Sequence, residues 1–157
     1  MNPYQIILAD DHLMFRNGLK RIIEDSQNLL VIGEADDGLQ LLELLKKTVP
    51  DMVILDISMP NLRGLEAAHE IKAGYPDIKI LILTMHRNKE YLIQALSAKA
   101  DGYLLKEYTD GQLIDAIESI RNGKIFLSPL MSEDLSQNLL GFIESCDQSF
   151  NETLSTR

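Results

Sequence analysis

The stretch Met52-Val53-Ile54-Leu55-Asp56 places four consecutive apolar side chains directly before a carboxylate. An apolar run without polar alternation is typical of a strand covered on both faces, as in a parallel sheet between two layers of helices. Asp56 then stands where such a strand leaves the core. A buried strand that ends in an acidic residue predicts a site at the end of that strand.

Four similar short runs occur elsewhere in the chain: Ile6–Leu8, Leu30–Ile32, Lys79–Leu83 and Gly102–Leu105. Between these runs, apolar residues recur at helical spacing, for example over 15–23, 65–71 and 113–120. Five strand–helix units in series predict an α/β fold, a doubly wound parallel sheet of five strands with helices on both faces. The flavodoxin-like strand order 2-1-3-4-5 would bring the first and third strands side by side.

The helix predicted after the fifth strand has sequence signals at both of its ends. Thr109 and Gln112 have the spacing of a capping box, which predicts Thr109 as the N-cap. Gly123 follows the last apolar position and predicts the point where the helix stops. We therefore expect this helix to be well delimited.

Polar residues follow the strands at the edge where ligands bind to open parallel sheets. The first strand is followed by Asp10 and Asp11, the third by Asp56, the fourth by Thr84 and the fifth by Lys106. Each residue alone has an ordinary interpretation as a helix cap, a turn residue or a surface side chain. Their joint occurrence predicts one cleft with three carboxylates, a hydroxyl and an ammonium.

The chemistry of this donor set indicates a hard cation and a phosphoryl group. Three close carboxylates repel one another unless a cation intervenes, and oxygen ligands without a paired His or Cys favour Mg²⁺ over zinc. Mg²⁺ in proteins typically binds one or two carboxylates and a phosphate oxygen. Asp56, in the middle of the cleft, is expected to accept the phosphoryl group as an acyl phosphate, with Thr84 and Lys106 neutralising charge.

Composition and missing motifs argue against several other functions. The 157 residues include 24 acidic and 15 basic side chains, a net charge of −9, which disfavours direct binding to nucleic acid. The single cysteine, Cys146, cannot form an internal disulfide. No secretory signal, bilayer-length apolar run or Gly-rich nucleotide motif is visible, so we expect a cytoplasmic domain without membrane contact. His12 is expected in a surface or helix-cap role, and Met85 as core or loop filler.

Taken together, the motifs resemble the receiver domain of two-component response regulators. They are Asp-Asp-His at 10–12, LDISMPNLRGLE at 55–66, LTMH at 83–86 and GYLLK at 102–106. The resemblance covers residues 1–127. The sequence GKIFLSP at 123–129 makes the chain similar to the NarL/FixJ branch of this family, whose members usually end in a LuxR-type helix-turn-helix.

The resemblance implies a phosphoryl group transferred to Asp56 by a sensor histidine kinase, in the presence of Mg²⁺. It implies Asp11, Asp56 and the backbone carbonyl of Ser58 as metal ligands, with Asp10 acting through water. Thr84 and Lys106 would hold the phosphate oxygens. A homodimer is also expected on family grounds.

Three further positions follow from the same resemblance. Tyr103 occupies the place of an aromatic side chain that turns inward when Thr84 is drawn toward the phosphoryl group. Glu107 follows Lys106 where many members have proline, so the loop here is expected to differ. Ser58 and His86 would flank the acyl phosphate and influence how fast water attacks it.

Residues 128–157 differ in character from the preceding part. Ser128-Pro129 predicts the start of a linker helix with an apolar stripe over 135–143, followed by a flexible tail. The final Leu-Ser-Thr-Arg, 154–157, is similar to the opening of a LuxR-type domain. We therefore expect a fragment of a longer transcription regulator, which would bind DNA only through a C-terminal domain absent from this chain.

The sequence thus predicts a phosphorylation-activated signalling switch that controls a transcription-regulating output domain, and not an enzyme with an external substrate. One alternative is a Mg²⁺-dependent phosphatase with an aspartate nucleophile, of the haloacid dehalogenase type. That chemistry normally uses a second Asp two residues after the nucleophile, where this chain has Ser58. Another alternative is an interaction module that works without phosphate.

Overall fold

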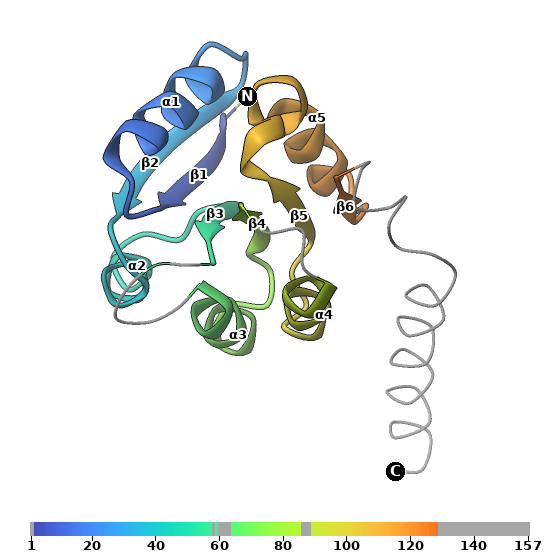
Figure 1. Cartoon of the computed structure of the whole chain (residues 1–157). Coiled ribbons are helices and arrows are strands. Elements are labelled where there is room, and N and C mark those ends of the chain that lie inside the picture. Colours follow the sequence, from blue (N-terminus) through green and yellow to red (C-terminus); the bar gives the residue numbers. More distant parts are fainter. Residues whose placement is uncertain (1, 58, 60–63, 86–88, 129–157) are drawn as a thin grey trace, which may run out of the picture.

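A parallel sheet lies between two layers of helices in the computed structural model (Figure 1), which describes residues 2–57, 59, 64–85 and 89–128. The strands are β1 (Tyr4–Ala9), β2 (Leu29–Ala35), β3 (Met52–Asp56), β4 (Lys79–Thr84), β5 (Gly102–Leu105) and β6 (Phe126–Leu127). The helices are α1 (Leu13–Glu24), α2 (Gly38–Leu45), α3 (Gly64–Gly74), α4 (Lys89–Ser97), the 3-10 turn η1 (Lys106–Tyr108) and α5 (Thr109–Arg121). The order across the sheet is β2-β1-β3-β4-β5-β6, and every pairing is parallel.

The predicted α/β fold and the order 2-1-3-4-5 are confirmed, with one strand more than the five expected. After α5 the chain turns at Gly123, whose φ is +84°, and returns along β5. The Phe126 amide donates to the carbonyl of Asp101 at 3.0 Å, and the Ser128 amide to that of Tyr103 at 3.0 Å. A two-residue edge strand is too short to produce a sequence pattern, so only these hydrogen bonds reveal it.

Alternating strand residues build two separate cores. Ile7, Val53 and Ile80 belong to the core under α2, α3 and α4, whereas Ile6 and Met52 belong to the core under α1 and α5. Figure 1 shows these two helical layers on opposite faces of the sheet. Because both faces are covered, all five residues of β3 are buried, which is the reason the first four, Met52 to Leu55, are continuously apolar.

The beginning of α5 differs from the prediction. Thr109 is the first residue of the helix and not its N-cap, and its hydroxyl donates to the carbonyl of Lys106. The turn η1 runs directly into α5, so Thr109 already has helical geometry and the capping box with Gln112 does not form. The predicted stop is confirmed, because the Gly123 amide donates to Ile120 O at 2.9 Å.

Ser128, where the sequence predicts the start of a linker helix, is the last described residue. Its side chain is fully buried, and its Oγ accepts a hydrogen bond from the Leu105 amide at 3.0 Å. The predicted linker helix and tail, 129–157, lie outside the described residues. Within the described part of the chain, no helix has the length and apolar character needed to cross a bilayer.

Candidate functional site

The carboxyl ends of β1, β3, β4 and β5 bring the predicted side chains to one edge of the sheet. Ala9 of β1 pairs with Leu55 of β3, so Asp10 and Asp56 occupy neighbouring positions just beyond that pair. Lys106 follows β5 directly and begins η1. The parallel register therefore places residues that lie far apart in the sequence around one point.

Lys106 supplies positive charge to two buried carboxylates. Its Nζ lies 2.9 Å from Asp10 Oδ2 and 3.3 Å from Asp56 Oδ2. Both aspartates are 1% exposed. The ammonium also lies 4.6 Å from the centroid of the Phe15 ring, which covers it with an apolar face. Two carboxylates removed from water with one ammonium leave an excess of negative charge.

Asp11 and His12 complete the cluster on its open side. Asp11 is exposed, and His12 Nδ1 lies 3.2 Å from Asp11 Oδ1, 3.2 Å from Asp10 Oδ1 and 4.0 Å from Asp56 Oδ2. His12 stands at the N-cap position of α1, but its side chain caps no backbone group there. Its imidazole lies beside the three carboxylates instead. The expected surface or cap role for His12 did not include this proximity.

The donor set fits a hard divalent cation. Asp10, Asp11, His12 and Asp56 each offer a ligand atom, and these atoms all lie within 4.8 Å of one another. Three of the four are carboxylates, the ligands that Mg²⁺ prefers. Ser58, whose carbonyl the family resemblance implies as a metal ligand, lies outside the described residues, as does His86.

Thr84 and Tyr103 lie on neighbouring strands close to this edge. Asp56 pairs in register with Leu83, so Thr84 is one position further along β4, and its side chain is fully buried. Tyr103 is 1% exposed and belongs to the core under α2, α3 and α4. The aromatic residue that the sequence singled out is thus packed inside the domain in this structure.

Gly64 permits the close return of the chain to Asp56. A Cβ atom at this position would lie 2.2 Å from the Asp56 carbonyl oxygen and 2.7 Å from the Cα of Ile57. Both distances are far below van der Waals contact, so only glycine allows α3 to begin here. Gly64 belongs to the motif at 55–66, but the sequence alone did not reveal the steric reason for a glycine at this position.

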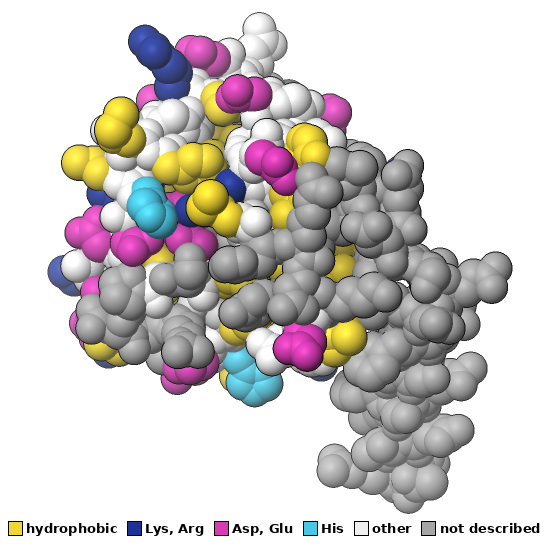
Figure 2. Space-filling model, in the orientation of Figure 1, with side chains coloured by type: hydrophobic (Ala, Val, Ile, Leu, Met, Phe, Trp, Pro, Cys, Tyr) yellow, Lys and Arg dark blue, Asp and Glu magenta, His cyan; other side chains and the backbone are white. Residues whose placement is uncertain are grey.

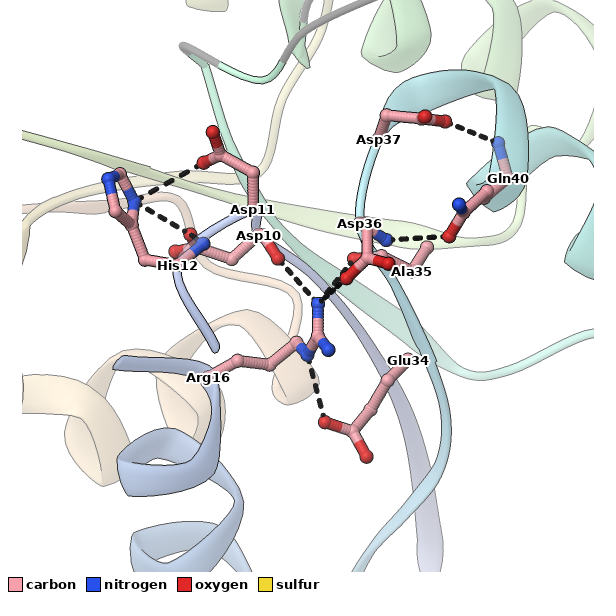
Figure 3. A network of polar contacts seen from close by, with 9 residues as sticks. All are labelled: Asp10, Asp11, His12, Arg16, Glu34, Ala35, Asp36, Asp37 and Gln40. Carbon is pink, nitrogen blue, oxygen red and sulfur yellow. Dashed lines mark hydrogen bonds and ion pairs between the residues drawn. The ribbon is translucent and has the colours of Figure 1, made fainter. Parts of the chain in front are cut away.

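Arg16 is a buried charged residue that the sequence interpretation overlooked (Figure 3). Its side chain extends from α1 to the ends of β1 and β2, next to the acidic cluster. Burial by itself lowers the pKa of Arg16, but hydrogen bonding to Asp36 and Glu34, and their charges, outweigh burial and raise that pKa. The sequence carried one signal for Arg16, its position in the first turn of a helix. A cation there opposes the helix dipole and therefore needs negatively charged or carbonyl partners elsewhere.

A cavity of about 510 Å³ opens beside Lys106. Its lining is mainly apolar and consists of His12, Met14, Phe15, Met85, Lys106 and Glu107. Met14 is 89% exposed and Met85 is 74% exposed, so of the two roles expected for Met85, core or loop, the structure shows the loop. Figure 2 shows acidic side chains gathered beside a histidine on this face, with hydrophobic side chains next to them.

Comparison with known proteins gives a consistent result. Residues 6–118 match the model for the response regulator receiver domain. The chain is 34% identical over 151 residues to the transcriptional regulatory protein DegU of Brevibacillus brevis, covering 96% of this chain and 64% of DegU. The chain thus spans less than two thirds of the length of DegU.

Two solved structures extend the comparison. A two-component response regulator of the LuxR family from Aurantimonas sp. SI85-9A1 superposes with a TM-score of 0.83 at 32% identity, over 88% of this chain and 99% of that one. The isolated receiver domain of RcsB from Salmonella enterica serovar Typhimurium, solved with the phosphomimetic BeF₃⁻, gives 0.78 at 30% identity, over 84% and 98%.

Proposed function

Because this chain belongs to the response regulator receiver domain family, in its NarL/LuxR branch, we propose that Asp56 accepts a phosphoryl group from a sensor histidine kinase. The observation that carries this proposal is the position of Asp56, a buried carboxylate at a strand end, 3.3 Å from the Lys106 ammonium. The RcsB receiver, 30% identical, was solved with an analogue of the phosphoryl group.

In the proposed reaction an oxygen of the Asp56 carboxylate attacks phosphorus. The bond between phosphorus and the kinase imidazole nitrogen breaks as the acyl phosphate bond forms, and the imidazole retains the electron pair of the broken bond. A carboxylate nucleophile needs no separate base to activate it. Lys106 would neutralise the phosphoryl oxygens, and Thr84 would donate its hydroxyl to one of them.

Asp11 and Asp56, with Asp10 acting through water, would hold the Mg²⁺ that the family match implies, together with the carbonyl of Ser58. When bound, the ion supplies positive charge to the carboxylates and the phosphoryl oxygens. Asp10 and Asp56 already share Lys106, so one protein cation faces at least two buried negative charges. The excess negative charge makes these residues fit a divalent cation.

Signal output in this proposal begins at Thr84 and Tyr103. Attraction of the Thr84 hydroxyl to the phosphoryl group frees space on β4, which favours the buried position that the Tyr103 ring has in this structure. The resulting surface controls homodimer formation and, in the whole protein, a DNA-binding output domain. Residues 1–127 form the receiver in this scheme and 128–157 the connection to the output.

Intact-mass measurement after incubation with acetyl phosphate and Mg²⁺ tests the proposal. The parent should gain one phosphoryl group, about 80 Da, and Asp56→Asn should gain none because the nucleophile is missing. Asp25→Asn, a change at an exposed aspartate remote from the cluster, serves as the matched control and should behave as the parent.

The same preparations separate the alternatives. An adduct on Asp56→Asn equal to that of the parent would place the nucleophile elsewhere and refute the proposal. Multiple turnover of a phosphate ester by the parent would favour the phosphatase. Equal assembly of the parent and Asp56→Asn with and without acetyl phosphate would favour the phosphate-independent module.

A further inference from the structure

Arg16 is a charged residue in an unfavourable place for a cation. It is the fourth residue of α1, where the positive end of the helix dipole disfavours a guanidinium. Only 8% of the residue is exposed, so solvation does not compensate. The partners that Arg16 meets inside the protein must therefore account for its presence.

Four oxygen atoms surround the Arg16 guanidinium. Nη1 donates to the carbonyl of Asp10 at 2.7 Å and to that of Ala35 at 3.2 Å, and also contacts the Asp36 carboxylate. Nε donates to Glu34 Oε1 at 3.0 Å. The first oxygen belongs to the loop after β1, whereas the other three belong to the end of β2 and the residue after it. One side chain thus joins two strand ends.

The bond to Asp10 fixes the backbone that orients the cluster. In Figure 3 the Asp10 carbonyl points toward Arg16, while the side chains of Asp10 and Asp11 lie on the opposite side, toward His12. The Asp10 amide is held as well, by a 3.0 Å hydrogen bond to Ala35 O. Because the Asp10 amide is bound to Ala35 at the end of β2 and the Asp10 carbonyl to Arg16 of α1, the peptide linking Asp10 to Asp11 has a defined orientation.

We propose that Arg16 is a positioning residue for Mg²⁺: it holds the Asp10–Asp11 backbone so that both carboxylates face the ion without Arg16 contacting it. This inference rests on the proposed function, because it assumes that the cluster binds Mg²⁺. A planar guanidinium can serve several oxygens in fixed directions, whereas the compact ammonium of lysine cannot. The planar geometry of the Arg16 guanidinium is therefore required in addition to its charge.

Calorimetric titration of the 157-residue chain with MgCl₂ tests the role of Arg16. Replacing residues that orient metal ligands typically weakens metal binding about 10- to 100-fold, and we expect this range for Arg16→Met. Arg16→Lys keeps the positive charge but loses the planar guanidinium, so its dissociation constant for Mg²⁺ should rise about 10-fold. Urea unfolding, followed by circular dichroism, verifies that each variant is folded.

Glu34→Gln is the matched control. It weakens the Nε contact of Arg16 but leaves both carbonyl bonds of Nη1 in place. Its stability should fall, while its Mg²⁺ dissociation constant stays within about twofold of the parent, because that contact does not touch the Asp10 backbone.

The outcomes distinguish this inference from the proposed function. If folded Arg16→Lys binds Mg²⁺ as tightly as the parent, charge alone suffices and Arg16 does not position the ligands. If Glu34→Gln weakens Mg²⁺ binding as much as Arg16→Lys, the effect follows from lost stability and the inference is also refuted. If the parent itself takes up no Mg²⁺, the proposed function fails, and this inference fails with it.

Discussion

Lys106→Met removes the ammonium that Asp10 and Asp56 share while keeping a side chain of similar length. Both carboxylates are 1% exposed, so water cannot replace the lost charge. Removing one partner of a buried ion pair leaves an uncompensated charge, which is the costly direction of change. We expect the metal-free variant to be markedly less stable than the parent.

The size of the effect follows from the two distances, 2.9 Å to Asp10 and 3.3 Å to Asp56. At an effective dielectric constant of about 20, each contact gives an attraction of about 5 kcal/mol. Regained solvation of the ammonium in the unfolded chain offsets much of this sum, and broken buried pairs typically cost about 3–5 kcal/mol. That loss is a large share of the roughly 5–15 kcal/mol of unfolding free energy in natural domains.

Urea unfolding in a chelating buffer, with and without MgCl₂, measures the prediction. Mg²⁺ should stabilise Lys106→Met more than the parent, because the ion supplies positive charge that the variant lacks. Adding Asp10→Asn to Lys106→Met should restore stability, since it removes one of the two stranded charges. Lys124→Met, at an exposed lysine, is the control and should unfold within about 0.5 kcal/mol of the parent.

Two results would contradict this account of the site. A free energy of unfolding for Lys106→Met within about 1 kcal/mol of the parent would mean that the buried carboxylates do not depend on the ammonium. Equal stabilisation of the parent and Lys106→Met by Mg²⁺ would mean that ion and ammonium do not act on the same carboxylates.

Two further substitutions test the supports of the site. Gly64→Ala should destabilise the domain by about 1–3 kcal/mol, because a Cβ there would lie 2.2 Å from the Asp56 carbonyl oxygen. The same clash should slow phosphorylation of Asp56 by acetyl phosphate. An unchanged urea midpoint and an unchanged phosphorylation rate would refute the steric argument. Ser128→Ala should cost about 1–3 kcal/mol by leaving the buried Leu105 amide without its acceptor, and hydrogen exchange at that amide should speed up relative to the parent.

The sheet and most of the acidic cluster were predictable because their signals are local and repeated. A strand buried on both faces must be apolar throughout, so MVIL at 52–55 identified β3 without any knowledge of its neighbours. The residue after such a strand lies at the binding edge of the sheet. Asp10, Asp56 and Lys106 were found in this way, and the structure brings them together.

The sixth strand and the contacts of Ser128 were not predictable, because short edge pairing produces no periodic pattern. Ser128 before proline has the local signature of a helix start, yet tertiary pairing with β5 determines its environment. The predicted capping box at Thr109 does not form, because η1 runs directly into α5 and gives Thr109 a helical backbone conformation.

The sequence by itself determined which residue types stand at the strand ends, because that requires only the period of the strands and the parallel order. Tertiary structure alone decided what those residues contact. Arg16 meets the Asp10 carbonyl because α1 packs beside the end of β2, and His12 faces three carboxylates because β1 and β3 are adjacent. Such contacts depend on distances between segments far apart in the chain, and no local pattern encodes these distances.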